Sequence, residues 1–344
     1  MSEEIKLTKF SHGGGCGCKI APSVLEKILH SSIQQISNSK LLVGYDTKDD
    51  AAVYDMGNGK AIISTTDFFM PIVDDAFDFG RIASANSISD VYAMGGKPLM
   101  AIAILGWPVE KIPVEIAQKV LDGARTICKE ASIPLAGGHS IDSPEPIFGL
   151  AVTGEVETKN IKKNSTAIEG CKLFLTKPLG VGMITTANKR GLAIKEDFDE
   201  AVNTMIRLNS IGYEFGKLDY VKAMTDVTGF GLLGHLIEMC EGSNLSAEIE
   251  YSKIPLLKNI SHYVSQMIYP DATFRNWKNY DTKVQGIGNE SLLTLCDPQT
   301  SGGLLVAVDP ANEKEFAAIA EKHGSALFYL GFLKSKNTAT VLVK

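Results

Sequence analysis

The sequence predicts an α/β (α+β) protein with two domains that follow a short arm. Its 344 residues suggest two domains of ordinary size. Apolar runs of strand length alternate with longer segments of helical periodicity, a pattern typical of sheets covered by helices. One polar, lysine-containing stretch at 157–170 interrupts this pattern and indicates a domain junction. We therefore expect a flexible, glycine-rich arm over 1–19, a first domain over 20–157 and a second domain over 170–344.

Turn signals divide the first domain into strands and helices. Asn58 and Gly59 lie between two strand-like runs and predict a β-hairpin. Gly95 and Gly96, followed by Pro98, predict the end of a helix. The expected elements are a helix over 22–32, strands over 41–43, 51–56 and 60–66, a helix over 79–94, a strand over 99–105, a helix over 113–131, and strands over 133–136 and 147–156.

The second domain shows the same alternation of strands and helices. Its segment 261–289 has no clear periodicity, so we predict no elements there. The expected elements are a strand over 172–176, a helix after residue 182, a helix over 198–216, a strand over 223–226, a helix over 229–241, strands over 247–251 and 302–308, a helix over 312–323, and strands over 326–333 and 339–343.

Composition indicates an enzyme of the cytoplasm. The chain is 44% hydrophobic and 22% charged, and it has no apolar run of about 18 residues and no secretory signal. Its six cysteines lack the spacing of a disulfide framework. The net charge of −6 argues against a direct nucleic-acid surface.

The arm carries an unusual combination of residues at 11–19. Three consecutive glycines precede Cys16 and Cys18, and Lys19 follows at once. An ammonium group near a thiol favours the reactive thiolate, and glycine keeps the backbone free to move. The arm is therefore either a mobile carrier of a nucleophile or a loose terminus with incidental cysteines. We favour the first interpretation.

Aspartates provide candidate metal ligands. Asp90 lies inside an otherwise apolar helix, one turn after Asn86, and needs a partner there. Two carboxylates 4 Å apart would repel by about 4 kcal/mol in a protein-like dielectric, so a convergent set would require a cation. Oxygen ligands point to Mg²⁺, although a helix cap or a turn is the simpler role for a single aspartate. The candidates are Asp49, Asp50, Asp67, Asp90 and Asp226.

Glycine-rich turns could approach a phosphate group. Gly137 and Gly138 follow a predicted strand, and Gly229 and Gly231 lie at a predicted helix start. None of these sequences fits the P-loop or the dinucleotide fingerprint. Tight turns are the simpler interpretation.

Taken together, these motifs closely resemble the selenophosphate synthetase (selenide, water dikinase) family. The similarity runs from about residue 6 to the C-terminus. Its aspartate and Gly-Gly motifs are shared with a wider ATP-binding superfamily that includes aminoimidazole ribonucleotide synthetase. The motifs are Gly-Cys-Gly-Cys-Lys at 15–19, Asp-Asp-Ala-Ala-Val at 49–53, Ser-Thr-Thr-Asp-Phe-Phe at 64–69, Asn-Ser-Ile-Ser-Asp-Val-Tyr-Ala-Met-Gly-Gly-Lys-Pro at 86–98, Ala-Gly-Gly-His-Ser at 136–140, Thr-Asp-Val-Thr-Gly-Phe-Gly-Leu-Leu-Gly-His at 225–235 and Asp-Pro-Gln-Thr-Ser-Gly-Gly at 297–303.

The resemblance implies a fold, a reaction and partners. The fold is the two-domain aminoimidazole ribonucleotide synthetase-like ATP-binding fold, whose N-terminal sheet pairs with that of a second subunit in a homodimer. The reaction converts ATP, selenide and water to selenophosphate, AMP and phosphate, with Mg²⁺ and usually K⁺. The product would supply activated selenium for selenocysteine and selenouridine synthesis, and a selenium-delivery protein is a possible partner.

The resemblance also assigns roles by position within the motifs. Cys16 matches the catalytic cysteine or selenocysteine, and Lys19 matches a lysine that contacts ATP and is needed for activity. Cys18 has no assigned role. Thr47, Lys48 and Asp49 match the nucleotide loop, and Asp50, Asp90 and Asp226 match the Mg²⁺ ligands. Asp67 and Asp90 match residues at the metal–nucleotide site. Gly138, His139 and Ser140 match a segment that reaches ATP from the partner subunit.

Two other functions compete with this interpretation. One is another reaction of the same superfamily, such as that of aminoimidazole ribonucleotide synthetase, but the Cys-Gly-Cys arm argues against it. The other is a non-catalytic thiol carrier for selenium or a soft metal that uses Cys16 and Cys18. The group of aspartates argues against a carrier, which would not consume ATP.

Overall fold

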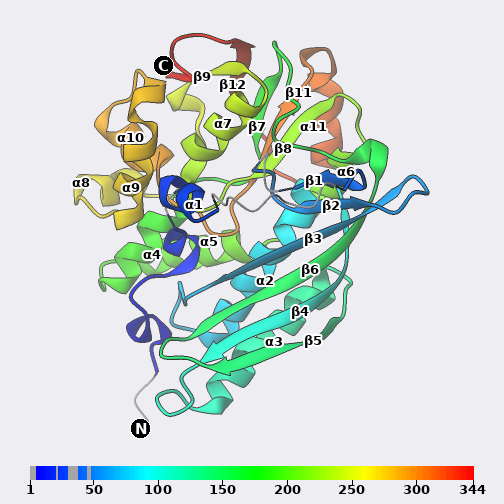
Figure 1. Cartoon of the computed structure of the whole chain (residues 1–344). Helices are drawn as coiled ribbons and strands as arrows, with labels where there is room; N and C mark the ends of the chain where they lie inside the picture. Colours follow the sequence, from blue (N-terminus) through cyan, green and yellow to red (C-terminus); the bar gives the residue numbers. More distant parts are fainter. Residues whose placement is uncertain (1–4, 21, 30–37, 45–47) are drawn as a thin grey trace.

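The chain folds around two mixed sheets, as the computed structural model shows (Figure 1). The structure describes residues 5–20, 22–29, 38–44 and 48–344. This confirms the predicted α/β architecture. Among the described residues, no helix has the length and apolar character needed to cross a membrane.

The first sheet has six strands in the order β1-β2-β3-β6-β4-β5. Neighbouring strands are antiparallel except β4 and β5, which are parallel. Helices α2 and α3 cover one face of this sheet, and the opposite face has no helix over it in Figure 1. The bounds are β1 Leu41–Val43, β2 Ala52–Asp55, β3 Lys60–Phe69, β4 Lys97–Trp107, β5 Leu135–Asp142, β6 Ile147–Glu157, α2 Ala76–Ala93 and α3 Val114–Glu130.

Helix α2 lies at the centre of the molecule. It contacts β3, β6 and α3 of the first half and α5, α6 and β8 of the second half. Glycines let α2 and α3 approach closely, because a Cβ atom at Gly80 would lie 1.9 Å from the Val120 carbonyl oxygen. Polar side chains on α2 are therefore buried, and their partners must come from the surrounding elements.

The second sheet has seven strands in the order β10-β13-β9-β12-β7-β11-β8. Helix α7 packs on one face, and α6 and α11 pack on the other. The bounds are β7 Lys172–Leu175, β8 Val221–Asp226, β9 Leu245–Ile249, β10 Val284–Gln285, β11 Leu304–Val308, β12 Phe328–Ser335, β13 Val341–Val343, α6 Ile211–Gly216, α7 Gly231–Gly242 and α11 Glu313–Lys322.

The predicted helix over 198–216 is wrong in one respect, because two helices occupy this part of the chain. Helix α5 ends before Arg207, whose carbonyl oxygen accepts a hydrogen bond from the buried Lys177 ammonium at 2.6 Å and so is bonded outside the helix. The segment 261–289, for which we predicted no elements, contains most of α8, all of α9, a 3₁₀ turn and the short strand β10. The remaining helices are α1 Pro22–Leu29, α4 Val181–Lys189, α5 Lys195–Ile206, α8 Ile260–Ser265, α9 Asp271–Tyr280 and α10 Asn289–Leu295.

The arm packs on the body of the protein. Leu7 is fully buried, and the Thr8 hydroxyl donates to Asp74 at 2.5 Å. Two 3₁₀ turns, Leu7–Phe10 and Gly15–Cys18, shape the segment, and the Gly15 amide donates to the Met70 carbonyl oxygen at 2.9 Å. The structure thus shows the arm in a docked position, while its flexibility stays a prediction.

Candidate active site

Buried carboxylates gather where α2, β3, β8 and the loop before β2 meet. Asp90 of α2 is 7% exposed and accepts a hydrogen bond from Thr65 of β3 at 2.5 Å, so this mid-helix aspartate has the partner it needs. Asp50 accepts a hydrogen bond from the Thr225 hydroxyl at 2.7 Å. Asp226 is 2% exposed at the end of β8. The structure therefore brings these three predicted ligands into one region.

Electrostatics at this region favour a bound cation. Burial and the nearby charge of Asp226 raise the pKa of Asp50, and burial together with Asp67 raises the pKa of Asp90. The Asp50 Oδ2 atom is buried and has no hydrogen-bond partner among the described residues. Within the described ranges, no group of three or more His, Cys, Asp or Glu side chains is placed so that it could hold a metal ion. The carboxylate oxygens are nevertheless the ligands that Mg²⁺ prefers, and a substrate would have to supply the rest of its coordination.

Asp67 lies inside β3, whereas the sequence placed it after the strand. Residues opposite each other in the ladder share a face, so Asp67 and its partner Leu150 point toward α2. Its carboxylate accepts a hydrogen bond from the Asn86 amide at 2.6 Å. Asn86 is fully buried, and its oxygen also accepts from the Ser301 amide at 2.8 Å.

A hydrogen-bond chain that we did not predict supports Asp226. The Ser89 hydroxyl donates to the Asp226 carboxylate at 2.5 Å, and Asn209 donates to Ser89 at 2.8 Å. Burial raises the pKa of Asp226, and the bond from Ser89 opposes this shift. The signal in the sequence is the run of small polar residues in a helix that is otherwise apolar.

The arm brings Cys16 to this region. Its thiol donates to the Asn86 side-chain oxygen at 3.2 Å, and its amide donates to the Thr300 hydroxyl at 3.0 Å. Cys16 is 2% exposed, and burial raises the pKa of its thiol despite the charge of Lys19. Lys19 favours the thiolate, as expected, but in the docked arm desolvation outweighs this attraction.

Lys19 lies between the arm and the carboxylates. Its Nζ atom is 4.0 Å from Asp67 and 3.5 Å from the Thr228 hydroxyl, and it lies 5.9 Å from the ring centroid of Phe230. Burial alone would lower the pKa of Lys19, but the attraction of Asp67 and the other acidic groups raises it. The ammonium group therefore stays charged.

The predicted nucleotide loop lies next to Asp50. Asp49 accepts a hydrogen bond from the Asn164 amide at 2.8 Å, and the Lys48 carbonyl oxygen accepts one from the Asn164 side chain at 2.8 Å. Lys48 has a left-handed φ of +54°. Thr47 lies outside the described residues.

Gly138, His139 and Ser140 are not part of the cluster of carboxylates in the same chain. They belong to the exposed edge strand β5, where we expected a turn, because the parallel ladder with β4 resumes at Gly138 after a shift in register. A Cβ atom at Gly138 would lie 2.3 Å from the Ala103 carbonyl oxygen, so only glycine fits this close approach.

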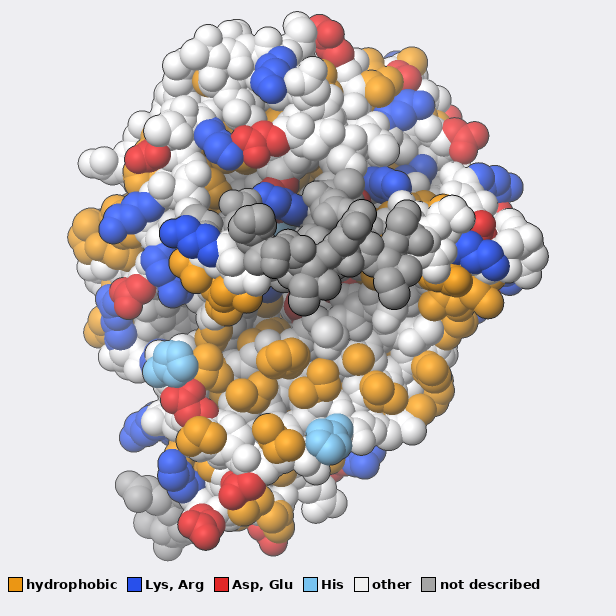
Figure 2. All heavy atoms as spheres, viewed as in Figure 1, with side chains coloured by type: hydrophobic (Ala, Val, Ile, Leu, Met, Phe, Trp, Pro, Cys, Tyr) orange, Lys and Arg blue, Asp and Glu red, His pale blue; other side chains and the backbone are white. Residues whose placement is uncertain are grey.

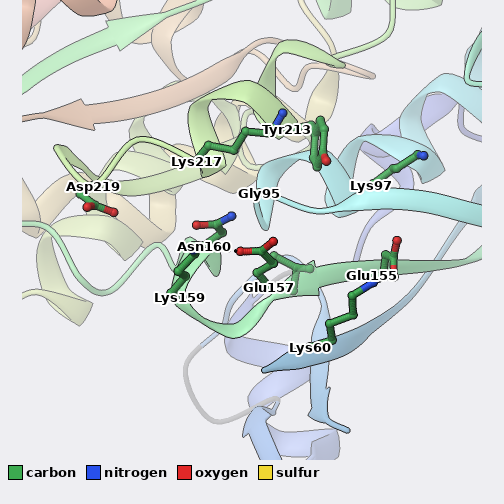
Figure 3. Close-up of a pocket in the computed structure, with 11 residues that line it drawn as sticks. Lys60, Gly95, Lys97, Glu155, Glu157, Lys159, Asn160, Tyr213, Lys217 and Asp219 are labelled. Atoms are coloured by element: carbon green, nitrogen blue, oxygen red, sulfur yellow. Dashed lines mark hydrogen bonds and ion pairs between the residues drawn. The ribbon is translucent and has the colours of Figure 1, made fainter. Parts of the chain in front are cut away.

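Two of the cavities that described residues line lie outside the cluster of carboxylates. One, of about 570 Å³, lies on the outer side of the arm and includes Cys18 in its wall. The other, of about 460 Å³, lies between α6 and the ends of β3, β4 and β6 (Figure 3). Its charges are mixed, and Lys60 and Lys159 pair with Glu155 and Glu157 at 3.1 and 3.2 Å. None of the predicted site residues lines this second cavity.

The fold and its sequence define the class of protein. Residues 48–156 match the family model of the AIR synthase related protein N-terminal domain, and residues 169–344 match that of the C-terminal domain. The fold is similar to a thiamine-monophosphate kinase from Stenotrophomonas maltophilia K279a, with a TM-score of 0.66 and 19% identity over 90% of this chain and 92% of that one. It is also similar to a chain of a HypE–HypF complex, with a TM-score of 0.69 and 18% identity over 93% and 96%.

Curated relatives define the particular family. The chain is 57% identical over 345 residues to a selenide, water dikinase from Haemophilus influenzae (strain 86-028NP), covering 100% of this chain and 99% of the relative. It is 55% identical over 343 residues to a selenide, water dikinase from Pseudomonas putida (strain KT2440), covering 100% of both. The chain belongs to the selenide, water dikinase family.

Proposed function

We propose that this chain makes selenophosphate from selenide, ATP and water, and that the reaction takes place where the arm meets the buried carboxylates. The full-length identity to selenide, water dikinases carries the proposal. The site agrees with it, since one region holds a cluster of carboxylates, an ammonium group and a thiol on a glycine-rich segment. AMP and phosphate are the proposed accompanying products.

Asp50, Asp90 and Asp226 would hold Mg²⁺. The support is chemical, because their oxygens are hard ligands and the Asp50 Oδ2 atom has no partner in the part of the chain that the structure describes. Bound Mg²⁺ neutralises charge on the triphosphate, which is what phosphoryl transfer requires. Lys48 and Asp49 would position the nucleotide beside these carboxylates. A requirement for K⁺ is proposed from the resemblance alone.

The arm would close over the nucleotide and deliver the selenium substrate. Cys16 is held by Asn86 and Thr300, so its Sγ atom occupies a fixed place inside the protein. Lys19 would stabilise negative charge on the phosphate groups, and the closed arm would exclude water from the selenium transfer.

The first sheet would pair with that of a second subunit. Its uncovered face carries Phe68, Met100 and Ile102, which are 52%, 44% and 45% exposed. Figure 2 shows hydrophobic side chains gathered over this face. His139 lies opposite Ile104 in the ladder and therefore on the same face. A partner on this face would bring its own Gly138, His139 and Ser140 close to the dimer interface, from which they could reach ATP.

The proposed location is the cytoplasm, because all six cysteines are free in the structure. A selenium-delivery protein remains a proposed partner.

Phosphorus NMR of the protein with Mg-ATP and selenide tests the proposed function. Selenophosphate, AMP and phosphate should appear together, and all three should depend on selenide. The Cys16→Ala variant should bind ATP but form no selenophosphate.

ADP as the sole product, or turnover without selenide, would refute the reaction. Full selenide-dependent activity of Cys16→Ala would refute the role of the thiol. A thiol carrier would bind selenide and leave ATP intact, and the aminoimidazole ribonucleotide synthetase reaction would need a different substrate.

A further inference from the structure

The docked arm raises the question of how selenide reaches Cys16. The thiol is 2% exposed and faces Asn86 inside the protein. The space beside Cys16 and Lys19 is a cavity of only about 10 Å³. Near neutral pH selenide is the hydrogen selenide anion, so its path must accept a small negative charge.

The cavity on the outer side of the arm has the required charge. It is about 570 Å³ in volume, and Lys189, Arg190 and Arg275 line it. Among the described residues that line it, Asp271 is the one carboxylate, while His12, also in the wall, pairs with Glu145 at 2.9 Å. Three cationic side chains against one carboxylate make this a place where small anions concentrate.

The outer cavity adjoins the small cavity at Cys16. Gly17, Ala272 and Arg275 line both of them. A Cβ atom at Gly17 would lie in ordinary van der Waals contact with Pro298 at 3.7 Å and Ala272 at 3.9 Å, so these small groups adjoin at the boundary. The wall between the two spaces is therefore thin and made of small groups and one arginine.

Arg275 stands at this boundary. Its Nη2 atom donates to the Gly17 carbonyl oxygen at 2.8 Å, so the guanidinium is fixed to the arm next to Cys16. Among the described residues, this is the one hydrogen bond that the Arg275 guanidinium makes, and a guanidinium has five N–H donors. The remaining N–H groups can bind an anion. Lys189 donates to the Ser11 carbonyl oxygen at 3.2 Å and holds the other end of the arm.

We propose that the outer cavity is the access route and holding site for the hydrogen selenide anion, and that Arg275 binds the anion at the inner end before it passes to Cys16. With such a route, the arm would not have to undock each time a selenide anion enters. This inference rests on the proposed role of Cys16 as the thiol that positions selenide for the reaction, with no bond formed between sulfur and selenium.

Steady-state kinetics under reducing conditions test this route. Arg275→Gln should raise the KM for selenide about tenfold, with kcat and the KM for ATP unchanged, because the variant loses attraction for an anion and no group that contacts ATP. Added salt should raise the KM for selenide in the wild type and have less effect in the variant. Arg275→Lys keeps the charge and should restore most of the affinity. Arg125→Gln, an exposed arginine of α3, is the control and should behave as the wild type.

Three results would overturn the proposal. A lower kcat with an unchanged KM for selenide would mean that Arg275 only holds the arm. Loss of affinity in Arg275→Lys equal to that in Arg275→Gln would exclude a role for charge. A change confined to inhibition by added phosphate would mean that the cavity releases product. Failure of the role of Cys16 looks different, since Cys16→Ala would then be active while Arg275→Gln still raised the KM for selenide.

Discussion

The bond from Ser89 to Asp226 provides a sharp test of the proposed metal site. Ser89→Ala removes the hydroxyl that donates to the Asp226 carboxylate at 2.5 Å. Both side chains are buried, so water does not replace the lost donor. The bond opposes the rise in the pKa of Asp226 that burial causes. The variant should therefore have a still higher pKa at Asp226.

The expected effect on Mg²⁺ follows from this shift. A hydrogen bond to a charged group contributes about 1.5–3 kcal/mol, which corresponds to about ten- to hundredfold in an equilibrium constant. Mg²⁺ binds the deprotonated carboxylate, so protons compete with it more strongly in the variant. The apparent affinity for Mg²⁺ should fall by this factor near neutral pH and approach the wild-type value as the pH is raised.

The assay is the Mg²⁺ dependence of selenophosphate formation at several pH values. Ser84→Ala is the matched control, because Ser84 lies on the same helix, is equally buried, and its hydroxyl has no partner in the described part of the chain. Its Mg²⁺ dependence should equal that of the wild type. Equal Mg²⁺ dependence of Ser89→Ala and Ser84→Ala would refute the assignment of Asp226 as a ligand.

Two further predictions concern stability and assembly. Burial raises the pKa of Asp297 from 3.8 to about 7, so the native protein keeps a proton that the unfolded chain loses above about pH 4. The free energy of unfolding should therefore fall as the pH rises from about 4 to about 7. Asp297→Asn should flatten this pH dependence in urea unfolding, and an unchanged slope would contradict the shift. Ile102→Lys should convert the proposed dimer to a monomer in light scattering. Val114→Lys, at an apolar and exposed site on α3, should leave the dimer intact. A monomeric wild type would contradict the interface.

Local signals were sufficient for most of the fold. The hairpin at Asn58 and Gly59 connects β2 to β3, and the paired glycines Gly95 and Gly96 end α2, as predicted. Errors arose where a tertiary contact determined the local conformation. Lys177 donates a hydrogen bond to the Arg207 carbonyl oxygen just after α5 ends, and the ladder with β4 keeps Gly138 in a strand.

The candidate site shows the limit of sequence reasoning more clearly. Asp90 was marked by its place in an apolar helix, but the spacing of Asp50 and Asp226 along the chain carries no information on their distance in space. Asp50 precedes β2 of the first sheet, and Asp226 ends β8 of the second. They meet only because α2 lies between the two sheets and contacts β8.

The arm shows why the chemistry of a residue depends on where it docks. From sequence, Lys19 next to Cys16 indicated a thiolate. In the docked arm, burial raises the pKa of the Cys16 thiol and so keeps it neutral. The charge of Lys19 instead attracts the nearby carboxylates. A thiol that reacts only after losing this proton is protected from oxidants while it waits, because the thiolate is the reactive form. Docking, and not the sequence of the arm alone, therefore sets when Cys16 can react.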